Sequence, residues 1–268
     1  MASFQADSDS DSDNSEAFFG DEFFTSVRTK TGLEVGIRVQ WPDVKPFTLS
    51  TCLSSDAIAP LFHGTQWAGT RIWQAAVVAL QYLLQQRTSI PITEQQTVLE
   101  LGCGIGVPGI ILNALTNCHV ILSDRDSLME QLQHNLQTVT PTLTRNDHNT
   151  DTMRIQAHEL DWSRQGVQQL LQTTSFANGF DVVLNCDCIF EPLYGESWKK
   201  LVECQEALLQ INPSTYMLTS VERRRFDGIE NYLAAIEASN IVKRVQQIPL
   251  DPLVYPEEVE LYRLYGEA

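Results

Sequence analysis

Segments predicted as strands alternate with segments predicted as helices from residue 97 to the end of the chain. The strands are continuous apolar runs, which is typical of a parallel sheet covered by helices on both faces. We therefore expect a doubly wound α/β fold. Its seven strands are predicted at 97–103, 119–124, 155–160, 180–189, 216–221, 242–248 and 259–265. Helices are predicted at 108–115, 127–138, 165–173, 197–210 and 228–238. Only ten residues join the last two strands, which suits an antiparallel hairpin better than a helical crossover.

Further elements are predicted before this sheet. Residues 33–41 alternate apolar and polar side chains after a turn signal at 30–32, which indicates a β-hairpin. Apolar residues at helical spacing predict a helix over 67–84. The first 22 residues carry seven acidic side chains and no Lys or Arg, a composition that cannot bury a core. We expect residues 1–22 to form a disordered acidic tail and 23–268 to form one domain.

Charge narrows the classes of partner. The chain has 34 acidic and 18 basic side chains, a net charge of −16. Binding to nucleic acid or anionic lipid needs surplus positive charge, so we expect neither partner, whereas a basic protein fits. The longest apolar run, 72–84, contains Gln74 and Gln81 and is shorter than the roughly 20 residues that cross a membrane.

Cysteine usage points to a reducing compartment. The six cysteines include no CxxC pair, and no His stands beside Cys186 and Cys188 to complete a zinc site. We therefore expect reduced thiols, no metal and a cytoplasmic location, with the nucleus as a second compartment. No basic segment followed by an apolar core opens the sequence, so no signal peptide is predicted.

The most informative stretch is the glycine-rich segment 98–109, where a buried strand turns sharply into a helix. Glycines there allow positive φ angles and a close approach of the backbone to a ligand. Asp124 ends the next strand, 20 residues after Gly104, where a carboxylate accepts hydrogen bonds from the two hydroxyls of a ribose. This pattern fits S-adenosylmethionine, a dinucleotide, or a glycine turn without a ligand.

Glu100 favours S-adenosylmethionine among these alternatives. Its carboxylate, two residues before Gly102, would repel a pyrophosphate but can receive the ammonium end of S-adenosylmethionine through water. A nicotinamide enzyme also usually needs a second, substrate-binding domain, for which this chain has little room.

Segment 98–109 resembles the first motif of the class I, seven-strand methyltransferases, whose sheet is Rossmann-like with an antiparallel last strand. Other matches resemble the methyltransferase-like protein-lysine methyltransferases, methyltransferase family 16. They are 69–76, 122–126 with Asn135, 159–162, 184–190 and 221–224. Members of this family modify chaperones, translation elongation factors, a AAA ATPase and calmodulin. The resemblance implies that the chain methylates a lysine side chain of a protein substrate, with a chaperone or translation factor as the expected class.

The resemblance also implies where the cofactor is held. Trp73 would line its pocket, and Gly102, Cys103 and Gly104 would offer backbone groups to its amino-acid tail. Asp124 would hold the ribose, while Asp161 and Trp162 would contact the adenine. The full set of expected cofactor-binding residues is Trp73, Glu100, Gly102, Cys103, Gly104, Gly106, Asp124, Asp161, Trp162 and Cys186.

Asp187 and Phe190 are the expected catalytic residues. Asp187 ends an apolar strand at the carboxyl edge of the sheet, where its carboxylate can fix an incoming lysine ammonium. The alternative for Asp187 is a helix cap or a structural ion pair. Phe190 stands where Tyr is usual in the family, so it keeps an aromatic wall without the hydroxyl. No His is predicted as a general base, and a proton route through water is equally consistent.

Other charged residues have plainer interpretations. Glu191 and Glu196 do not match the spacing of the paired glutamates that bind guanidinium in arginine methyltransferases, so we expect them to face solvent or cap a helix. Residues 223–225 are three arginines at the end of a strand, for which we expect a surface or substrate-cleft role and not a nuclear signal.

The sequence therefore predicts a monomeric S-adenosylmethionine-dependent protein-lysine methyltransferase. One alternative is a different acceptor, namely a protein arginine or histidine or a small amine. The other is a methyltransferase fold that only binds a partner.

Overall fold

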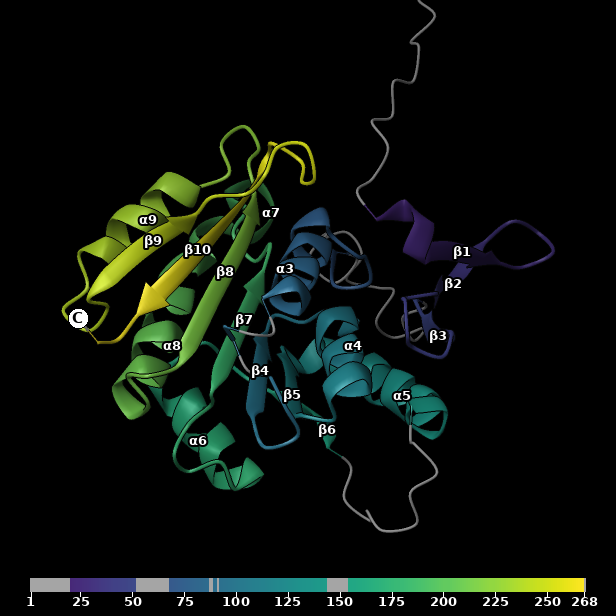
Figure 1. The fold of residues 1–268 in the computed structure, drawn as a ribbon, viewed down its shortest axis with the longest axis horizontal. Coiled ribbons are helices and arrows are strands. Elements are labelled where there is room, and N and C mark those ends of the chain that lie inside the picture. The colour runs from purple at the N-terminus through teal and green to yellow at the C-terminus, as the bar shows by residue number, and fades with distance from the viewer. Residues whose placement is uncertain (1–19, 52–67, 87–88, 91, 144–153, 268) are drawn as a thin grey trace, which may run out of the picture.

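Two sheets form in the computed structural model, which describes residues 20–51, 68–86, 89–90, 92–143 and 154–267 (Figure 1). The strands of the larger sheet are β4 (Thr97–Leu101), β5 (His119–Asp124), β6 (Ile155–Glu159), β7 (Val182–Cys186), β8 (Tyr216–Glu222), β9 (Arg244–Ile248) and β10 (Val259–Tyr265). Their order is β6-β5-β4-β7-β8-β10-β9. The first five strands in this order are parallel, and β10 is antiparallel to β8 and β9. The predicted seven-strand α/β sheet with an antiparallel end is confirmed.

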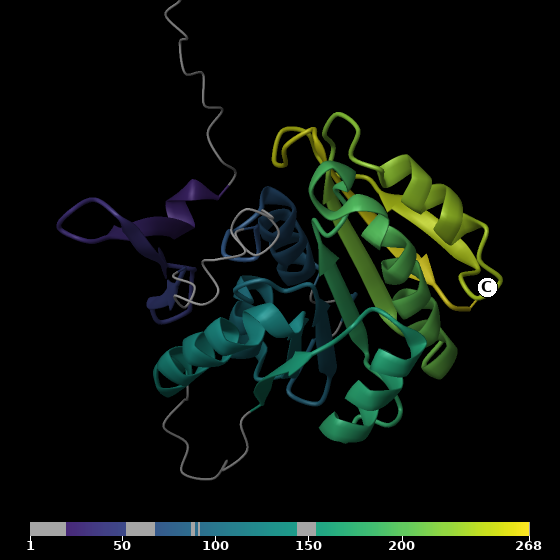
Figure 2. The same cartoon turned by 180° about the vertical axis from the view of Figure 1, so that it is seen from behind.

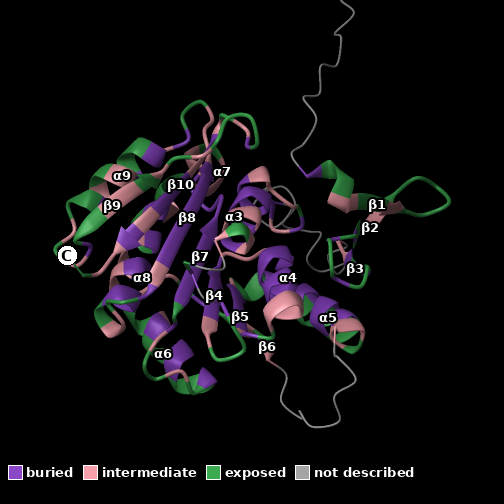
Figure 3. Ribbon diagram, in the orientation of Figure 1, coloured by how far each residue is buried: buried purple, intermediate pink, exposed green. Residues whose placement is uncertain are grey.

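Helices cover both faces of this sheet (Figures 1 and 2). One face carries α3 (Gln74–Gln85), α4 (Val107–Thr116) and α5 (Asp126–Leu143), and the other carries α6 (Arg164–Thr174), α8 (Trp198–Ile211) and α9 (Ile229–Glu237). Successive strand residues enter opposite cores, as Val98 and Leu99 of β4 do. Burial on both faces (Figure 3) explains why β4 and β7 are mostly apolar in the sequence, with Glu100 and Asn185 as buried polar residues within them.

A separate antiparallel sheet consists of β1 (Phe24–Arg28), β2 (Glu34–Val39) and β3 (Phe47–Ser50). The pair β1–β2 confirms the predicted hairpin, whereas β3 was not predicted because its run of four residues is too short to show a period. Asn135 of α5 joins this sheet to the main domain. The Ser50 N–H donates to Asn135 Oδ1 at 2.7 Å, and Asn135 Nδ2 donates to the Ser50 carbonyl at 3.1 Å.

The helix predicted over 67–84 is wrong at its first end, because α3 begins at Gln74. Trp73 has extended backbone angles (φ −103°, ψ 145°), and its carbonyl oxygen accepts the N–H groups of Ala76 and Val77. Residue 67 itself lies outside the described residues. Trp73 is therefore the N-cap residue of α3 and not part of the helix. Its side chain lies at the edge of the sheet.

Other boundaries also differ from the prediction. The strand expected over 180–189 is limited to β7, because Asp187 has a left-handed φ of 53° and extended pairing ends before it. A short helix, α7 (Glu191–Tyr194), and a 3-10 turn, η3 (Gly195–Ser197), follow and were not predicted. Of the expected tail, residues 1–19 lie outside the described residues, while Asp21–Phe23 forms a 3-10 turn, η1.

Candidate functional site

A cavity of about 800 Å³ lies at the carboxyl ends of the parallel strands. Parallel α/β sheets bind ligands at this edge because the strand-to-helix loops diverge there. Ten of the twelve expected site residues line the cavity: Trp73, Glu100, Gly102, Cys103, Gly104, Asp124, Asp161, Trp162, Cys186 and Asp187. The other two, Gly106 and Phe190, are not among the described residues that line it. The sequence pattern thus brings together side chains from five separate segments.

The turn between β4 and α4 requires glycine at three positions. Gly102, Gly104 and Gly106 have φ angles of 61°, 55° and 75°, in the left-handed region that other residues rarely adopt. A Cβ at Gly104 would also lie 2.7 Å from the carbonyl oxygen of Gly69, and a Cβ at Gly106 would lie 2.6 Å from Leu122. Gly106 therefore shapes the turn from the core side, which explains its place outside the cavity lining.

Glu100 lines the cavity although only 2% of its surface is exposed. Its Oε2 accepts a hydrogen bond of 2.8 Å from the N–H of Gly109, in the first turn of α4. Burial raises the pKa of Glu100 to about 8, even though the Gly109 hydrogen bond acts in the opposite direction. A bound cation, such as the ammonium end of S-adenosylmethionine, would favour the ionised carboxylate of Glu100 and so lower its pKa.

Asp124 ends β5 and holds the glycine turn in place. Its Oδ2 accepts from the N–H of Gly104 at 2.8 Å, and its Oδ1 accepts from the N–H of Arg125 at 2.8 Å. Burial raises the pKa of Asp124, and these two hydrogen bonds oppose the rise. Each carboxylate oxygen keeps a second lone pair, so the group can still accept hydrogen bonds from ribose hydroxyls.

Asp161 and Trp162 also line the cavity. Asp161 Oδ1 lies 3.2 Å from Lys200 Nζ of α8, in an ion pair whose side chains are both more than half exposed. The indole of Trp162 packs beside Gly102, where an added Cβ would lie 3.1 Å from its Cζ2. Lys200 was not predicted as a site residue, because nothing in the sequence of α8 distinguishes it from a solvated lysine.

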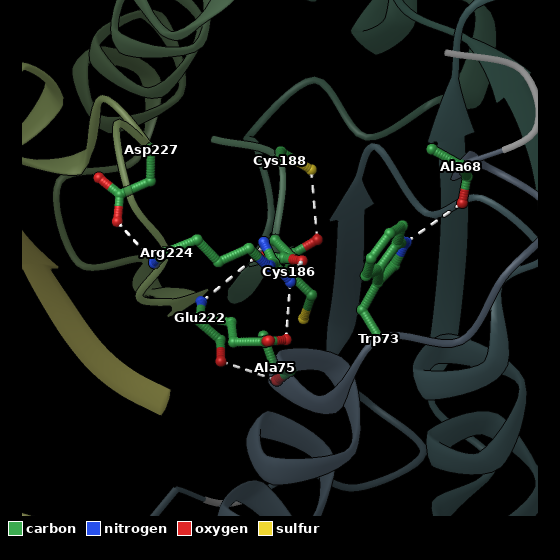
Figure 4. Close-up of polar contacts among 10 residues, drawn as sticks. Ala68, Trp73, Ala75, Cys186, Cys188, Glu222, Arg224 and Asp227 are labelled. Atoms are coloured by element: carbon green, nitrogen blue, oxygen red, sulfur yellow. Dashed lines mark hydrogen bonds and ion pairs between the residues drawn. The ribbon is translucent and has the colours of Figure 1, made fainter. Parts of the chain in front are cut away.

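Asp187 is buried and paired with Arg224, as the alternative to its predicted role anticipated. Arg224 Nη1 donates to Asp187 Oδ1 at 3.1 Å and Nη2 donates to Oδ2 at 2.7 Å, while Nη2 also lies 2.7 Å from Glu222 Oε2. Figure 4 shows Arg224 reaching from its loop toward the end of β7. The Asp187 carboxylate, which was expected to bind a substrate lysine, is therefore paired with the Arg224 guanidinium in this structure.

Two aromatic rings also lie close to this guanidinium. Its central carbon lies 5.3 Å from the ring centroid of Trp73 and 5.3 Å from that of Phe190. Trp73 is fixed by a hydrogen bond of 3.1 Å from its Nε1 to the carbonyl of Ala68 (Figure 4). Phe190 thus contacts Arg224 and is not among the described residues that line the cavity.

The remaining charged residues behave largely as expected. Arg223 pairs with Glu260 at 2.6 Å, and Arg225 is exposed, so of the three arginines only Arg224 enters the site. Glu191 accepts from Trp198 Nε1 at 2.8 Å and begins α7. Tyr194, which the sequence analysis missed, places a phenol in the cavity lining, and burial raises its pKa.

A glycine turn, two buried carboxylates and an indole around a nucleoside-sized cavity define a class I methyltransferase that uses S-adenosylmethionine. A family model described as lysine methyltransferase matches residues 63–239, so the chain belongs to the lysine methyltransferase family. The predicted family, enzyme class and cofactor are confirmed.

Individual relatives differ in their named roles. A protein of Plasmopara viticola, "Secreted RxLR effector protein 48", is 36% identical over 137 residues, which cover 51% of this chain and 68% of that protein. The mouse "Histone-arginine methyltransferase METTL23" is 30% identical over 159 residues, 58% of this chain and 55% of that protein. The present chain thus matches little more than half of the mouse protein.

A solved structure supports the fold alone. The S-adenosylmethionine-dependent methyltransferase of Agrobacterium tumefaciens superposes with a TM-score of 0.52 at 13% identity, covering 93% of this chain and 76% of that one. In the described part of the present chain, no helix combines the length and apolar character needed to span a membrane.

Proposed function

We propose that this chain transfers the methyl group of S-adenosylmethionine to a lysine side chain of a protein substrate. The observation that carries the proposal is the adjacency of two sites. The cavity lined by Glu100 and Asp124 shares its wall residues Trp73 and Asp187 with an acidic, aromatic site that holds a cation. A methyl donor in the cavity and a cationic acceptor in the second site would therefore meet at this wall.

Separate residues would hold each part of the cofactor. Glu100 would face the ammonium of the amino-acid tail, and the backbone of residues 102–104 would contact that tail. Asp124 would accept from the ribose hydroxyls, and Asp161 with Trp162 would contact the adenine. When bound, the sulfonium supplies an activated leaving group, so the protein contributes alignment and exclusion of water.

The acceptor site must attract the lysine ammonium and then allow it to lose a proton. A lysine ammonium has a reference pKa of about 10.4, so it loses a proton before it can act as a nucleophile. The carboxylates of Asp187 and Glu222 attract the charged form, and the side chain of Trp73 excludes water beside it. The proton then leaves through water at the open side of the cavity.

The proposal is tested by binding and transfer measured separately. Calorimetry with S-adenosylmethionine and S-adenosylhomocysteine should show binding to the full chain with a dissociation constant on the order of micromolar, or about −8 kcal/mol. Transfer of a labelled methyl group to candidate proteins, with mass-spectrometric mapping, should then identify a modified lysine. Asp187→Asn should reduce transfer while cofactor binding persists. A stable complex without transfer, unaffected by Asp187→Asn, would instead establish the partner-binding alternative.

An arginine acceptor is the second candidate. It is favoured by the histone-arginine methyltransferase named among the relatives and by the guanidinium that the acidic site already accommodates. Mapping of the modified residue decides between the candidates, because a methylated guanidinium and a methylated ammonium give different fragment ions. A methylated arginine with no methylated lysine would reject the lysine proposal.

We further infer a monomeric protein of the cytoplasm and nucleus that acts on a chaperone or a translation factor. The net charge of −16 favours a basic protein surface as its partner and disfavours nucleic acid.

The cysteines support the proposed compartment. The free thiols, as in a reducing compartment, are those of Cys103, Cys118, Cys186, Cys188 and Cys204. Sedimentation of the purified chain and fractionation of tagged protein would test oligomeric state and location.

A further inference from the structure

Arg224 occupies a complete cation-binding cage, defined here as Trp73, Phe190, Asp187 and Glu222. The central carbon of the guanidinium lies 5.3 Å from the centroid of each of the two aromatic rings, and the guanidinium contacts two carboxylates at 2.7 Å. Aromatic faces and carboxylates together are the means by which proteins recognise guanidinium and ammonium groups of ligands. Arg224 therefore occupies the kind of site that a cationic substrate side chain would use.

The cage lies directly beside the cofactor cavity. Trp73 and Asp187 belong to both, whereas Arg224, Phe190 and Glu222 are outside the described cavity lining. The cage also carries more negative than positive charge, because two carboxylates face one guanidinium. A cation held in the cage thus contacts two residues, Trp73 and Asp187, that also line the cavity.

We infer that Arg224 is the resident occupant of the acceptor site, and that the cationic side chain of the substrate enters the cage by taking its place. The inference rests on the proposed methyl transfer to a cationic side chain. It makes Arg224 a residue that determines which acceptors are admitted, because only a side chain that competes for the rings and the carboxylates displaces it.

Exchange of one cation for another avoids the free-energy cost of an unpaired buried carboxylate. Asp187 is 4% exposed, and its carboxylate would be strongly destabilised if the Arg224 guanidinium left without replacement. Replacement by a substrate cation keeps that charge neutralised throughout. The Arg224 side chain is 22% exposed and has access to solvent, while its backbone N–H stays bound to Asp227 Oδ2 at 2.9 Å. Only the side chain needs to move.

Small cations test the cage without any substrate protein. We would titrate methylguanidinium and n-butylammonium chloride into wild type, Arg224→Ala and Arg225→Ala, with potassium chloride at equal ionic strength as the blank. Arg225 is the matched control, because it is exposed and stacks on Phe226 away from the cage. Calorimetry should show saturable binding to Arg224→Ala, tighter than to wild type or Arg225→Ala by at least ~10-fold.

The cage itself is tested in the Arg224→Ala background. Adding Phe190→Leu removes one ring and should weaken methylguanidinium binding by roughly 5-fold, as the loss of one cation–π contact implies. Arg224→Lys keeps a positive charge and the fold, and should admit methylguanidinium with an affinity between those of wild type and Arg224→Ala. Equal affinities in wild type, Arg224→Lys and a folded Arg224→Ala would overturn the inference.

The link to methyl transfer is tested with n-butylamine as acceptor. In that reaction the methyl–sulfur bond breaks, a methyl–nitrogen bond forms, a proton passes to water and S-adenosylhomocysteine is released. Its formation should be saturable in n-butylamine and at least ~10-fold faster in Arg224→Ala than in wild type at subsaturating amine. Binding of the cations without faster transfer would show that the cage is not the acceptor site.

The two proposals fail in different ways. Absence of S-adenosylmethionine binding and of protein methylation by wild type would reject the proposed function, whatever the cage binds. Intact cofactor binding and protein methylation, combined with no gain of small-cation binding in Arg224→Ala, would reject only the role of Arg224. Circular dichroism and S-adenosylhomocysteine affinity would establish that each variant compared is folded.

Discussion

The Asp124 carboxylate accepts a hydrogen bond of 2.8 Å from the backbone N–H of Gly104. The residue predicted to hold the ribose therefore also fixes the turn predicted to hold the amino-acid tail. Because β5 ends at Asp124 and β4 leads into the turn, the pairing of these two strands sets the geometry of both functions. Cofactor binding should thus be sensitive to either residue.

Asp124→Ala should weaken binding of S-adenosylhomocysteine by at least ~10-fold. The variant loses the acceptor for ribose hydroxyls and leaves the Gly104 N–H without its partner, each a loss of about 1–3 kcal/mol. Calorimetry measures the affinity directly. Glu130→Gln is the control, because it also removes one negative charge but lies exposed on α5. Equal weakening by both variants would attribute the effect to net charge.

Gly104→Ala should reduce both stability and cofactor affinity. A φ of 55° costs an alanine about 1–2 kcal/mol, and the added Cβ would in addition lie 2.7 Å from the Gly69 carbonyl. Gly32→Ala separates the two causes, because Gly32 has a φ of 87° with nothing within 4 Å of an added Cβ. Urea unfolding should therefore show a larger loss for Gly104→Ala, and equal losses would show that the contact with Gly69 is unimportant.

Binding of S-adenosylmethionine near pH 7 should release close to one proton. Glu100 has a pKa of about 8 in the free protein and is mostly protonated at this pH, whereas a bound ammonium favours its carboxylate. Calorimetry in buffers of different ionisation enthalpy counts the protons. Glu100→Gln should bind more weakly and release none. Equal proton release from both proteins would assign the proton to another group.

The same group makes stability depend on pH. Because burial raises the pKa of Glu100 from 4.5 to about 8, the folded state binds the proton more tightly than the unfolded state. The free energy of unfolding that Glu100 contributes should therefore be greatest below about pH 4.5, fall as pH rises toward about 8, and change little above it. Urea unfolding across this range should show a steeper fall in wild type than in Glu100→Gln, because the raised pKa values of Asp124 and Asp187 contribute equally to both proteins.

Asn135→Ala should destabilise the domain by about 1–3 kcal/mol, because it removes the hydrogen bonds that Asn135 makes with the N–H and the carbonyl of Ser50, while the carbonyl keeps its hydrogen bond from Gln131 Nε2. Gln137→Ala is the control on the same helix, since that side chain is exposed. Denaturant unfolding followed by circular dichroism measures both. Matching midpoints would show that β3 is held to α5 by other contacts.

Local sequence determined most of the fold. Strands β4, β5 and β7 are short, mostly apolar segments between helical patterns, and this information lies within each segment of five to ten residues. The glycine turn could likewise be predicted from the sequence, because three left-handed positions within five residues leave glycine as the ordinary choice. The start of α3 was not readable, since residues 72–76 have the apolar spacing of a helix while Trp73 is extended.

Only the tertiary structure decided what surrounds Asp187. Its partner Arg224 lies 37 residues further along the chain, and the two rings beside Arg224 belong to the residues that immediately precede α3 and α7. The contact between these residues could not be predicted from the sequence. A positive charge at the end of β8 has the same local pattern whether it faces solvent or a buried carboxylate. Strand order placed β7 beside β8, and that pairing brought the guanidinium to the acid.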